Sequence, residues 1–222
     1  LEENRYASEI RIISVIDRSE MVLDNGGRKD TSPRWSPDGA RLAFVSDRDG
    51  PAQLYIRDGG GEPRKLTDLS RGVSNPVWSP DGRRIAVLSS EGYGIDDEKR
   101  GREGGFIRHV KRLQYRFNEA DYIDDRFNHI WIVDAESGET RRLTAGEASV
   151  GSIAWSPDGT RIAFSANRVD EANSSFRSQL YVIDAASQPD GETDSAIAIS
   201  AGSEMAAGPA WSPDGSTIAF VG

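Results

Sequence analysis

The chain has 222 residues, a formal net charge of −9 at pH 7 and no cysteine. The acidic balance argues against a general nucleic-acid-binding surface, and the absence of cysteine excludes disulfides and thiolate metal sites. No apolar run approaches the ~18 residues of a transmembrane helix. We therefore expect a soluble, β-rich protein with a sizeable core and with neither a nucleic acid nor a membrane as partner.

The first predicted elements are two short strands at residues 12–16 and 21–23. They precede the first of four identical copies of the pentapeptide Trp-Ser-Pro-Asp-Gly. Such a repeated identity marks an internal repeat, and a repeat predicts the fold better than any local propensity does. The four copies lie at residues 35–39, 78–82, 155–159 and 211–215.

Each copy is predicted to form the turn of a β-hairpin. Proline presets φ at the first central position, aspartate tolerates the second, and glycine accepts the positive φ of a type I turn with a bulge. A short segment that ends in the tryptophan precedes the turn, and an apolar run follows it. These apolar runs lie at residues 42–45, 85–88, 162–164 and 218–221.

Two further strands complete the repeat unit. The third is an apolar and aromatic run that ends in aspartate, and the fourth is shorter and more polar. Four antiparallel strands with a polar outer edge describe one blade of a β-propeller. The third strands are predicted at 54–58, 130–134 and 180–184, and the fourth strands at 64–67, 141–144 and 196–199.

The spacing of the tryptophans reveals insertions. The first step fits the roughly 40–45 residues of a four-stranded blade, and the next two steps are longer. The larger excess lies at 91–127, and the smaller one is divided between 168–178 and 188–194. These positions fall between the second and third strands or in the turn after them, where loops accept insertions.

We predict an all-β fold, a partial β-propeller of four-stranded antiparallel blades with about four blade equivalents and incomplete at both ends. Because the chain opens on a third strand and ends on a second, we expect a segment of a longer propeller whose true N-terminus is missing. The predicted divisions are a half blade at 1–30, blades at 31–74, 75–148 with the insertion 91–127, and 149–202, and a half blade at 203–222.

The repeats resemble those of two protein groups, the TolB-like propellers and the N-terminal propeller of the prolyl oligopeptidase family of serine peptidases. The stretch that distinguishes the two groups comprises residues 112–118, 122–126 and 129–134. Its Arg-x-x-Tyr-Arg segment, its Asp-Arg turn and its strand beginning with histidine resemble the acylaminoacyl-peptidase-like branch of the peptidase family.

This resemblance implies a propeller, usually of seven blades, followed by an α/β-hydrolase domain with a Ser-Asp-His triad on the same parent chain. It implies short or N-acylated peptides as substrates and a propeller that limits their access. A homo-oligomer and a cytoplasmic location are further expectations. The insertion 91–127 has two open interpretations: a segment that faces the substrate cavity or the hydrolase domain, and a decorated loop.

The chain itself shows no catalytic centre. The hydrolase elbow Gly-x-Ser-x-Gly is absent, and the nearest fragment, residues 72–76, lacks the final glycine and leads into a predicted strand. With two histidines in the chain, no triad can be assembled. We therefore assign no catalytic, cofactor-binding or metal-binding residue, expect no cofactor, and predict that this chain alone is inactive.

Several conspicuous residues have a structural interpretation. We expect His109 in a solvated loop, with a contact to an acidic substrate or to the hydrolase domain as the alternative, and His129 to pack or to bond to the backbone. Turn geometry explains the repeated aspartates better than calcium does, because each turn has one carboxylate. Packing between blades explains the tryptophans better than carbohydrate stacking. The aspartates are Asp38, Asp81, Asp158 and Asp214.

Three functions follow from these patterns. The leading one is the access-limiting propeller of a serine peptidase. The second is a TolB-like propeller that binds a protein partner. The third is a self-sufficient small ring in which the two terminal half blades join, which would pair both exposed strand edges.

Overall fold

All regular structure in the described part of the chain is β-strand. The computed structural model describes residues 7–24, 26–93, 125–168, 177–200 and 205–222. Within these ranges three antiparallel sheets have four strands and two have two strands, and no helix there is long and apolar enough to cross a membrane. The predicted all-β fold with four-stranded antiparallel blades is therefore confirmed.

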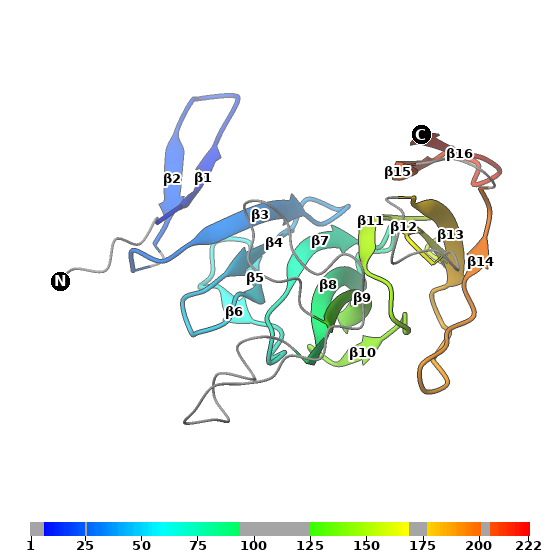
Figure 1. Cartoon of the computed structure of the whole chain (residues 1–222). Helices are drawn as coiled ribbons and strands as arrows, with labels where there is room; N and C mark the ends of the chain where they lie inside the picture. Colours follow the sequence, from blue (N-terminus) through cyan, green and yellow to red (C-terminus); the bar gives the residue numbers. More distant parts are fainter. Residues whose placement is uncertain (1–6, 25, 94–124, 169–176, 201–204) are drawn as a thin grey trace, which may run out of the picture. The chain divides into compact units, whose positions relative to one another are not determined.

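The first four-stranded sheet shows how the repeat folds. Its strands lie side by side in chain order (Figure 1). The four apolar residues Leu42 to Val45 in its second strand are all buried, as expected for a strand covered on both faces. The strands are β3 (Asp30–Trp35), β4 (Arg41–Ser46), β5 (Gln53–Asp58) and β6 (Arg64–Lys65).

The other sheets repeat this order. The second four-stranded sheet consists of β7 (Ser74–Trp78), β8 (Arg84–Tyr93), β9 (Asp125–Asp134) and β10 (Thr140–Arg142), and the third of β11 (Val150–Trp155), β12 (Arg161–Ala166), β13 (Gln179–Asp184) and β14 (Ile197–Ala198). The two-stranded sheets are β1 (Ile10–Ile13) with β2 (Glu20–Leu23), and β15 (Ala207–Trp211) with β16 (Ile218–Val221).

Every first strand has a β-bulge within the five residues that precede its tryptophan. Between Thr31 and Arg34 of β3 the register shifts against β4, and the same shift occurs in β7, β11 and β15. In β3 and β7 the first residue inside the bulge has a positive φ, which is 54° at Ser32 and 51° at Asn75. The proline that follows each is accommodated there, because a bulge needs no ladder hydrogen bond from it.

The chain divides into two compact units, which we describe separately. Unit 1 comprises Leu1–Ser89 with Ile130–Arg142, and unit 2 comprises Ser90–His129 with Leu143–Gly222. In unit 1, Leu54 and Ile56 of β5 share a buried cluster with Ile85 and Val87 of β8. Each such side chain contributes about 1.5–3 kcal/mol by leaving water.

The N-terminal hairpin differs from the prediction. A strand was expected at residues 12–16, whereas β1 ends at Ile13, and Val15 and Ile16 are both 94% exposed in a turn. The Ser14 N–H donates to the carbonyl of Ser19 at 2.9 Å, and Asp17 accepts the Ser19 N–H. These polar contacts close a tight turn, so the β-branched pair at its tip cannot continue the strand.

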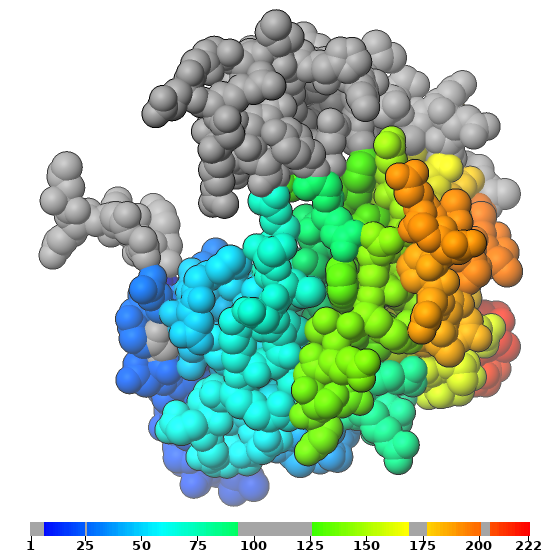
Figure 2. Space-filling view, turned by 90° about the horizontal axis from the view of Figure 1, so that it is seen from below, coloured from blue at the N-terminus to red at the C-terminus, as the bar shows by residue number. Residues whose placement is uncertain are grey.

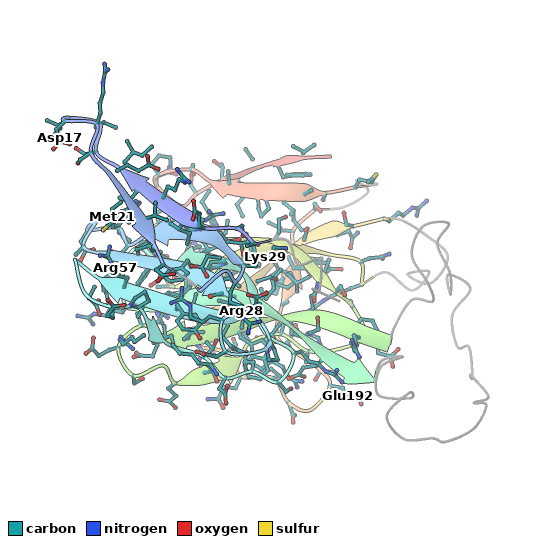
Figure 3. All side chains as sticks on the ribbon, turned by 90° about the vertical axis from the view of Figure 1, so that its left-hand side faces the viewer. Asp17, Met21, Arg28, Lys29, Arg57 and Glu192 are labelled. Carbon is teal, nitrogen blue, oxygen red and sulfur yellow. The ribbon has the colours of Figure 1, made fainter. Side chains whose placement is uncertain are left out.

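The hairpin β1–β2 packs on the first blade through one face. Ile10 and Leu23 share a buried cluster with Phe44 and Tyr55. On the same side, the Arg57 guanidinium contacts Met21 Sδ at 3.5 Å (Figure 3). The hairpin therefore packs on the first blade, the sheet β3–β6, in the position that the last two strands of a preceding blade would take.

Candidate functional site

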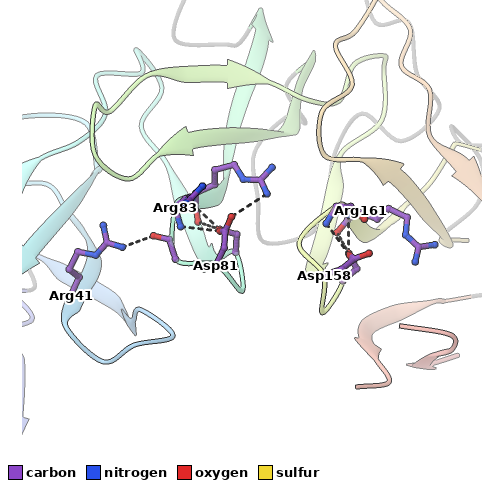
Figure 4. Close-up of polar contacts among 10 residues, drawn as sticks. Arg41, Asp81, Arg83, Asp158 and Arg161 are labelled. Carbon is purple, nitrogen blue, oxygen red and sulfur yellow. Dashed lines mark hydrogen bonds and ion pairs between the residues drawn. The ribbon is translucent and has the colours of Figure 1, made fainter. Parts of the chain in front are cut away.

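The four Trp-Ser-Pro-Asp-Gly turns share one hydrogen-bond pattern. In the third copy the Ser156 hydroxyl donates to Asp158 Oδ1 at 2.6 Å, and this oxygen also accepts the Thr160 N–H at 3.0 Å. Ser156 Oγ in turn accepts the Arg161 N–H at 2.9 Å. Equivalent bonds occur in the other three copies. Figure 4 shows the turns of Asp81 and Asp158.

These bonds favour the charged form of the turn carboxylates. The Ser156 hydroxyl, followed by the Thr160 N–H, lowers the pKa of Asp158 from 3.8 to about 2, and Ser212 does the same for Asp214. At Asp81 burial opposes the shift, but the Ser79 hydroxyl and the Arg83 N–H outweigh it, so the pKa is still lowered. Such carboxylates are poor proton donors or acceptors near neutral pH, which supports the structural interpretation.

Two of the four repeat tryptophans, Trp78 and Trp211, each donate a hydrogen bond to a backbone carbonyl of the preceding repeat. In unit 1 the Trp78 indole N–H donates to the carbonyl oxygen of Arg34 at 3.0 Å. In unit 2 the Trp211 indole N–H donates to the carbonyl oxygen of Ala154 at 3.2 Å. The acceptor in each case is the residue just before the tryptophan of the preceding repeat. The predicted packing role of the tryptophans thus includes a specific hydrogen bond.

An arginine follows each of the first three turns, and two of these arginines, Arg41 and Arg161, make a second link to the next repeat, which the sequence analysis missed. The Arg41 guanidinium lies 5.0 Å from the ring centre of Trp78 and donates to the Gly82 carbonyl at 2.6 Å (Figure 4). Arg161 lies 4.9 Å from the ring centre of Trp211. The signal was available, because arginine stands two residues after the turn glycine in three of the four copies.

A buried ion pair over two aromatic rings forms a second recurring feature, here called the arginine–aromatic cluster. In unit 1 the Arg48 guanidinium lies 4.9 Å from the ring centre of Tyr55 and 5.4 Å from that of Phe44. It donates to Asp30 Oδ2 at 2.9 Å, and the Asp30 side chain is fully buried. The guanidinium thus combines stacking with charge pairing.

Unit 2 repeats this cluster with an aspartate from another part of the repeat. Arg168 lies 5.1 Å from the ring centre of Phe164 and 5.2 Å from that of Tyr181. Its two terminal nitrogens donate to the two oxygens of Asp194, both at 2.8 Å. Burial alone would raise the pKa of Asp194, but the bonds from Arg168 outweigh it and lower the pKa. The signal in the sequence is Phe-x-x-x-Arg in two repeats.

His129 is buried, as its structural interpretation requires. Its Nδ1 lies 3.5 Å from the hydroxyl oxygen of Thr144. The preceding residue, Asn128, accepts a hydrogen bond from the Ser90 hydroxyl at 2.7 Å. The sequence placed His129 at the start of its strand, whereas β9 already begins at Asp125 and β8 extends to Tyr93. Strand pairing therefore continues into the insertion predicted at 91–127.

The remaining sequence predictions concern His109, the segment 112–118, the fragment 72–76 and metal binding. His109 and the segment 112–118 lie outside the described ranges. The fragment 72–76 leads into strand β7 as predicted, and its Gly72 has a φ of 72°. Among the described residues, no group of three or more His, Asp or Glu side chains could hold a metal ion.

One open groove of about 720 Å³ lies in unit 2. Apolar residues of β13, of β14 and of β16 line it, with Arg161 and Asp184 at its polar positions. In Figure 2 the orange β14 segment and the red C-terminal strand that border this groove lie on one side of unit 2. The apolar lining residues are Leu180, Val182, Ile197, Ile199, Ile218 and Phe220.

Two family models divide the chain between them. The model of the TolB beta propeller domain matches residues 2–102. The model of the dipeptidyl peptidase IV N-terminal region matches residues 100–205. The change from one to the other falls inside the insertion predicted at 91–127, the place where the sequence departs from plain TolB-like repeats.

Individual relatives show which of these two likenesses extends over more of the chain. The uncharacterized peptidase YuxL of Bacillus subtilis (strain 168) is 35% identical over 187 residues, which are 82% of this chain and 28% of that protein. The structure of the Pyrococcus horikoshii acylaminoacyl peptidase is similar with a TM-score of 0.63 and 20% identity, over 90% of this chain and 29% of that one. These likenesses together support a β-propeller segment of a peptidase of the prolyl oligopeptidase family.

The propeller segment also has the fold of TolB. The crystal structure of TolB from Acinetobacter baumannii is similar over 96% of the segment and 43% of that chain, with a TM-score of 0.59 and 19% identity. At this identity the likeness shows the fold alone. The resemblance drawn from residues 112–118, 122–126 and 129–134 is confirmed at the level of the family, and the segment spans little more than a quarter of YuxL.

Proposed function

We propose that the propeller segment is the non-catalytic part of a serine-type peptidase that hydrolyses short or N-acylated peptides. In this proposal it limits the access of substrates to an α/β-hydrolase domain in the same polypeptide. The observation that carries it is the 35% identity with a peptidase over 82% of the segment, against 28% of that peptidase. Most of the relative's length thus lies outside the matched region and has room for a catalytic domain.

The contacts in the segment support a scaffold role. The turn carboxylates bind their own serines and backbone N–H groups, and Asp30 and Asp194 pair with Arg48 and Arg168. These groups are committed to the fold and offer neither nucleophile nor base. Each of these contacts lies within one blade and stabilises its local structure. In this proposal the blades form the frame of an opening that admits substrates by size.

A fluorophosphonate probe, which labels reactive serines, tests whether the catalytic serine lies in the hydrolase domain and not in the propeller segment. We expect no labelling of the 222-residue chain and labelling of one serine in a polypeptide in which this chain replaces the matching segment of YuxL. Labelling of the isolated chain would contradict the proposed absence of a triad. An unlabelled but folded chimera, with YuxL labelled in parallel, would contradict the proposed pairing with a hydrolase domain.

The access role needs a separate experiment in the same chimera. Residues 94–124 are replaced by a short glycine linker between the strand ends Tyr93 and Asp125, which belong to the neighbouring strands β8 and β9. We expect kcat/KM for an N-acetylated tripeptide to change little and hydrolysis of a long unfolded polypeptide to rise. Equal changes for both substrates would contradict a role of this insertion in access.

A second candidate is a propeller that binds a protein partner. The match of residues 2–102 to the TolB beta propeller domain favours it. This candidate predicts that the chimera fails to label with fluorophosphonate while the isolated 222-residue chain folds. The labelling experiment therefore separates the two candidates.

A further inference from the structure

A buried guanidinium in the first blade donates one of its hydrogen bonds to a weak acceptor. Arg57, near the end of β5, is 8% exposed, and its Nε donates to the carbonyl oxygen of Gly61 at 2.8 Å. Its Nη2 contacts the thioether sulfur of Met21 on β2 at 3.5 Å (Figure 3). In the described part of the chain, no carboxylate forms an ion pair with Arg57. Because a thioether is a weak acceptor, this buried cation is poorly compensated on the side of the hairpin.

The other repeats place an apolar residue where the first blade has Arg57. Ile183 pairs with Ile162 as Arg57 pairs with Leu42. Val133 likewise stands immediately before the last aspartate of its strand. Ile183 is 1% exposed and Val133 is fully buried. A blade therefore forms with an apolar side chain at this position, and what distinguishes Arg57 is its contact with the hairpin.

Met21 stands at a strand position through which one sheet contacts the next. It has the place in β2 that Arg64 has in β6, because each pairs with an isoleucine of the strand before it. The Arg64 side chain donates to the carbonyl oxygen of Ala135, next to β9 of the following sheet, at 2.8 Å. At the hairpin the direction is reversed, since the arginine belongs to the following sheet and Met21 is the acceptor. The strength of this contact therefore depends on the acceptor at Met21.

The Met21 side chain is accessible, because 41% of the residue is exposed. Strand β2 has the place of a fourth strand, and the fourth strands β6, β10 and β14 each have one neighbour in their sheet. The exposure therefore does not depend on a strand beside β1. Met21 is two residues from Leu23, which is buried against the first blade, so it lies on the face turned toward that blade. Exposed methionine is oxidised to the sulfoxide, and reductases reverse this change.

We propose that Met21 is a site of reversible oxidation by hydrogen peroxide and that Arg57 binds the sulfoxide formed. In the oxidation a sulfur lone pair attacks one peroxide oxygen, the S–O bond forms, the O–O bond breaks, and the other oxygen leaves as water. Sulfur loses the two electrons that the peroxide gains. A sulfoxide reductase reverses the change with two electrons from a dithiol, and the oxygen leaves as water. This modification goes beyond the proposed peptidase function and does not depend on it.

The sulfoxide oxygen changes the contact between the hairpin and the first blade. A methionine side chain has three rotatable bonds, so the new oxygen can reach the guanidinium nitrogen that already lies 3.5 Å from the sulfur. A charge-assisted N–H···O bond is stronger than a bond to a thioether. Oxidation therefore strengthens the docking of the hairpin, whereas it disrupts an ordinary apolar contact.

Hydrogen exchange of the hairpin tests the proposal in two variants of the 222-residue chain. Both carry Met205→Leu, which leaves Met21 as the only methionine of the sequence, and one also carries Arg57→Val. After treatment with hydrogen peroxide, peptide mass spectrometry measures the conversion of Met21, and circular dichroism verifies the fold. On oxidation, we expect amide exchange at 10–13 and 20–23 to become about tenfold slower with Arg57 and to become faster with Arg57→Val.

Matched controls separate this contact from oxidation in general. A chain with Met21→Leu retains Met205, which is 66% exposed, and oxidation of Met205 should leave exchange of the hairpin unchanged. Arg57→Lys keeps a cationic donor, so oxidation of Met21 should still slow the exchange, by a smaller factor. Treatment of the oxidised chain with a sulfoxide reductase and a dithiol should restore the original exchange rates.

Three outcomes would overturn the proposal. Met21 that stays unoxidised at a peroxide concentration that converts Met205 completely would show that it is not an oxidation site. Unchanged or faster exchange of the oxidised hairpin in the presence of Arg57 would show that the sulfoxide is not bound. An equal effect of oxidation with Arg57 and with Arg57→Val would assign the effect to a group other than the guanidinium.

Discussion

The indole N–H of Trp78 donates a hydrogen bond to the carbonyl oxygen of Arg34, in the preceding repeat. The Trp78 side chain is also buried, with 8% of the residue exposed, whereas Trp35 is 53% exposed. The same residue type in the same motif is thus held by different contacts. Stability measurements at the two positions can separate the hydrogen bond from the apolar packing.

Trp78→Phe should destabilise the chain by about 1 kcal/mol, because it removes the indole N–H and leaves the Arg34 carbonyl without this donor. Trp78→Ala should cost about 3–5 kcal/mol, because it also removes a large buried ring. Equilibrium urea unfolding, followed by two spectroscopic probes, measures both values. Trp35→Phe is the matched control and should change stability little; an equal loss at both positions would contradict this account.

Acid should unfold the chain partly through its turn aspartates. The folded pKa of Asp158 and of Asp214 is about 2, below the ordinary 3.8. A lowered folded pKa contributes stability that is fully present above the ordinary value and is lost as the pH falls through the folded one. The melting temperature should therefore fall between about pH 4 and pH 2.

The double variant Asp158→Asn with Asp214→Asn should show a shallower fall of melting temperature across this range. Circular dichroism at a series of pH values gives the comparison. Glu62→Gln, at an exposed position, serves as the control and should reproduce the original slope. Parallel curves for the double variant and the original chain would show that the turns do not contribute.

The Arg48–Asp30 pair should be coupled in stability. Arg48→Met leaves the fully buried Asp30 carboxylate without its cation and should cost about 3–5 kcal/mol. Adding Asp30→Asn removes the buried charge and should recover part of this loss. A double-mutant cycle in urea measures the coupling. The exposed pair Lys65–Asp68, tested with Lys65→Met and Asp68→Asn, should show coupling of about 0–1 kcal/mol.

Gly138 should tolerate alanine worse than Gly59 does. Both have positive φ, 75° and 52°, but a Cβ at Gly138 would lie 2.6 Å from the carbonyl oxygen of Leu66, and a Cβ at Gly59 would meet nothing within 4 Å. Gly59→Ala should cost about 1–2 kcal/mol through φ alone. Gly138→Ala should cost clearly more, because backbone must shift. Equal unfolding free energies for the two variants would contradict the close approach at Leu66.

Local chemistry made the blades predictable from the sequence. Trp-Ser-Pro-Asp-Gly contains its whole turn, because Ser156, Asp158 and the N–H groups that they bind lie within five positions of one another. Likewise, the apolar run around Phe44 predicts a buried strand. In these segments the local preference and the final fold agree.

Contacts between distant segments were beyond prediction. Arg48 finds Asp30 and Arg168 finds Asp194, and the aspartate stands before the arginine in one case and after it in the other. A single sequence gives no means of matching them. The end of β1 was missed for another reason: Val15 and Ile16 have strand propensity, but Ser14, Asp17 and Ser19 close a turn around them.

The links between repeats have a consequence for how such a protein grows. Trp78 and Arg41 each bind a main-chain carbonyl of the adjoining repeat, and every residue provides such a carbonyl whatever its side chain. If a repeat were duplicated, its tryptophan and arginine could therefore bond to carbonyl oxygens of the adjoining repeat without any change in the side chains of that repeat. The same geometry would let a unit be copied, lost or exchanged as a whole, so that blade number can change while the sequence of each blade diverges freely.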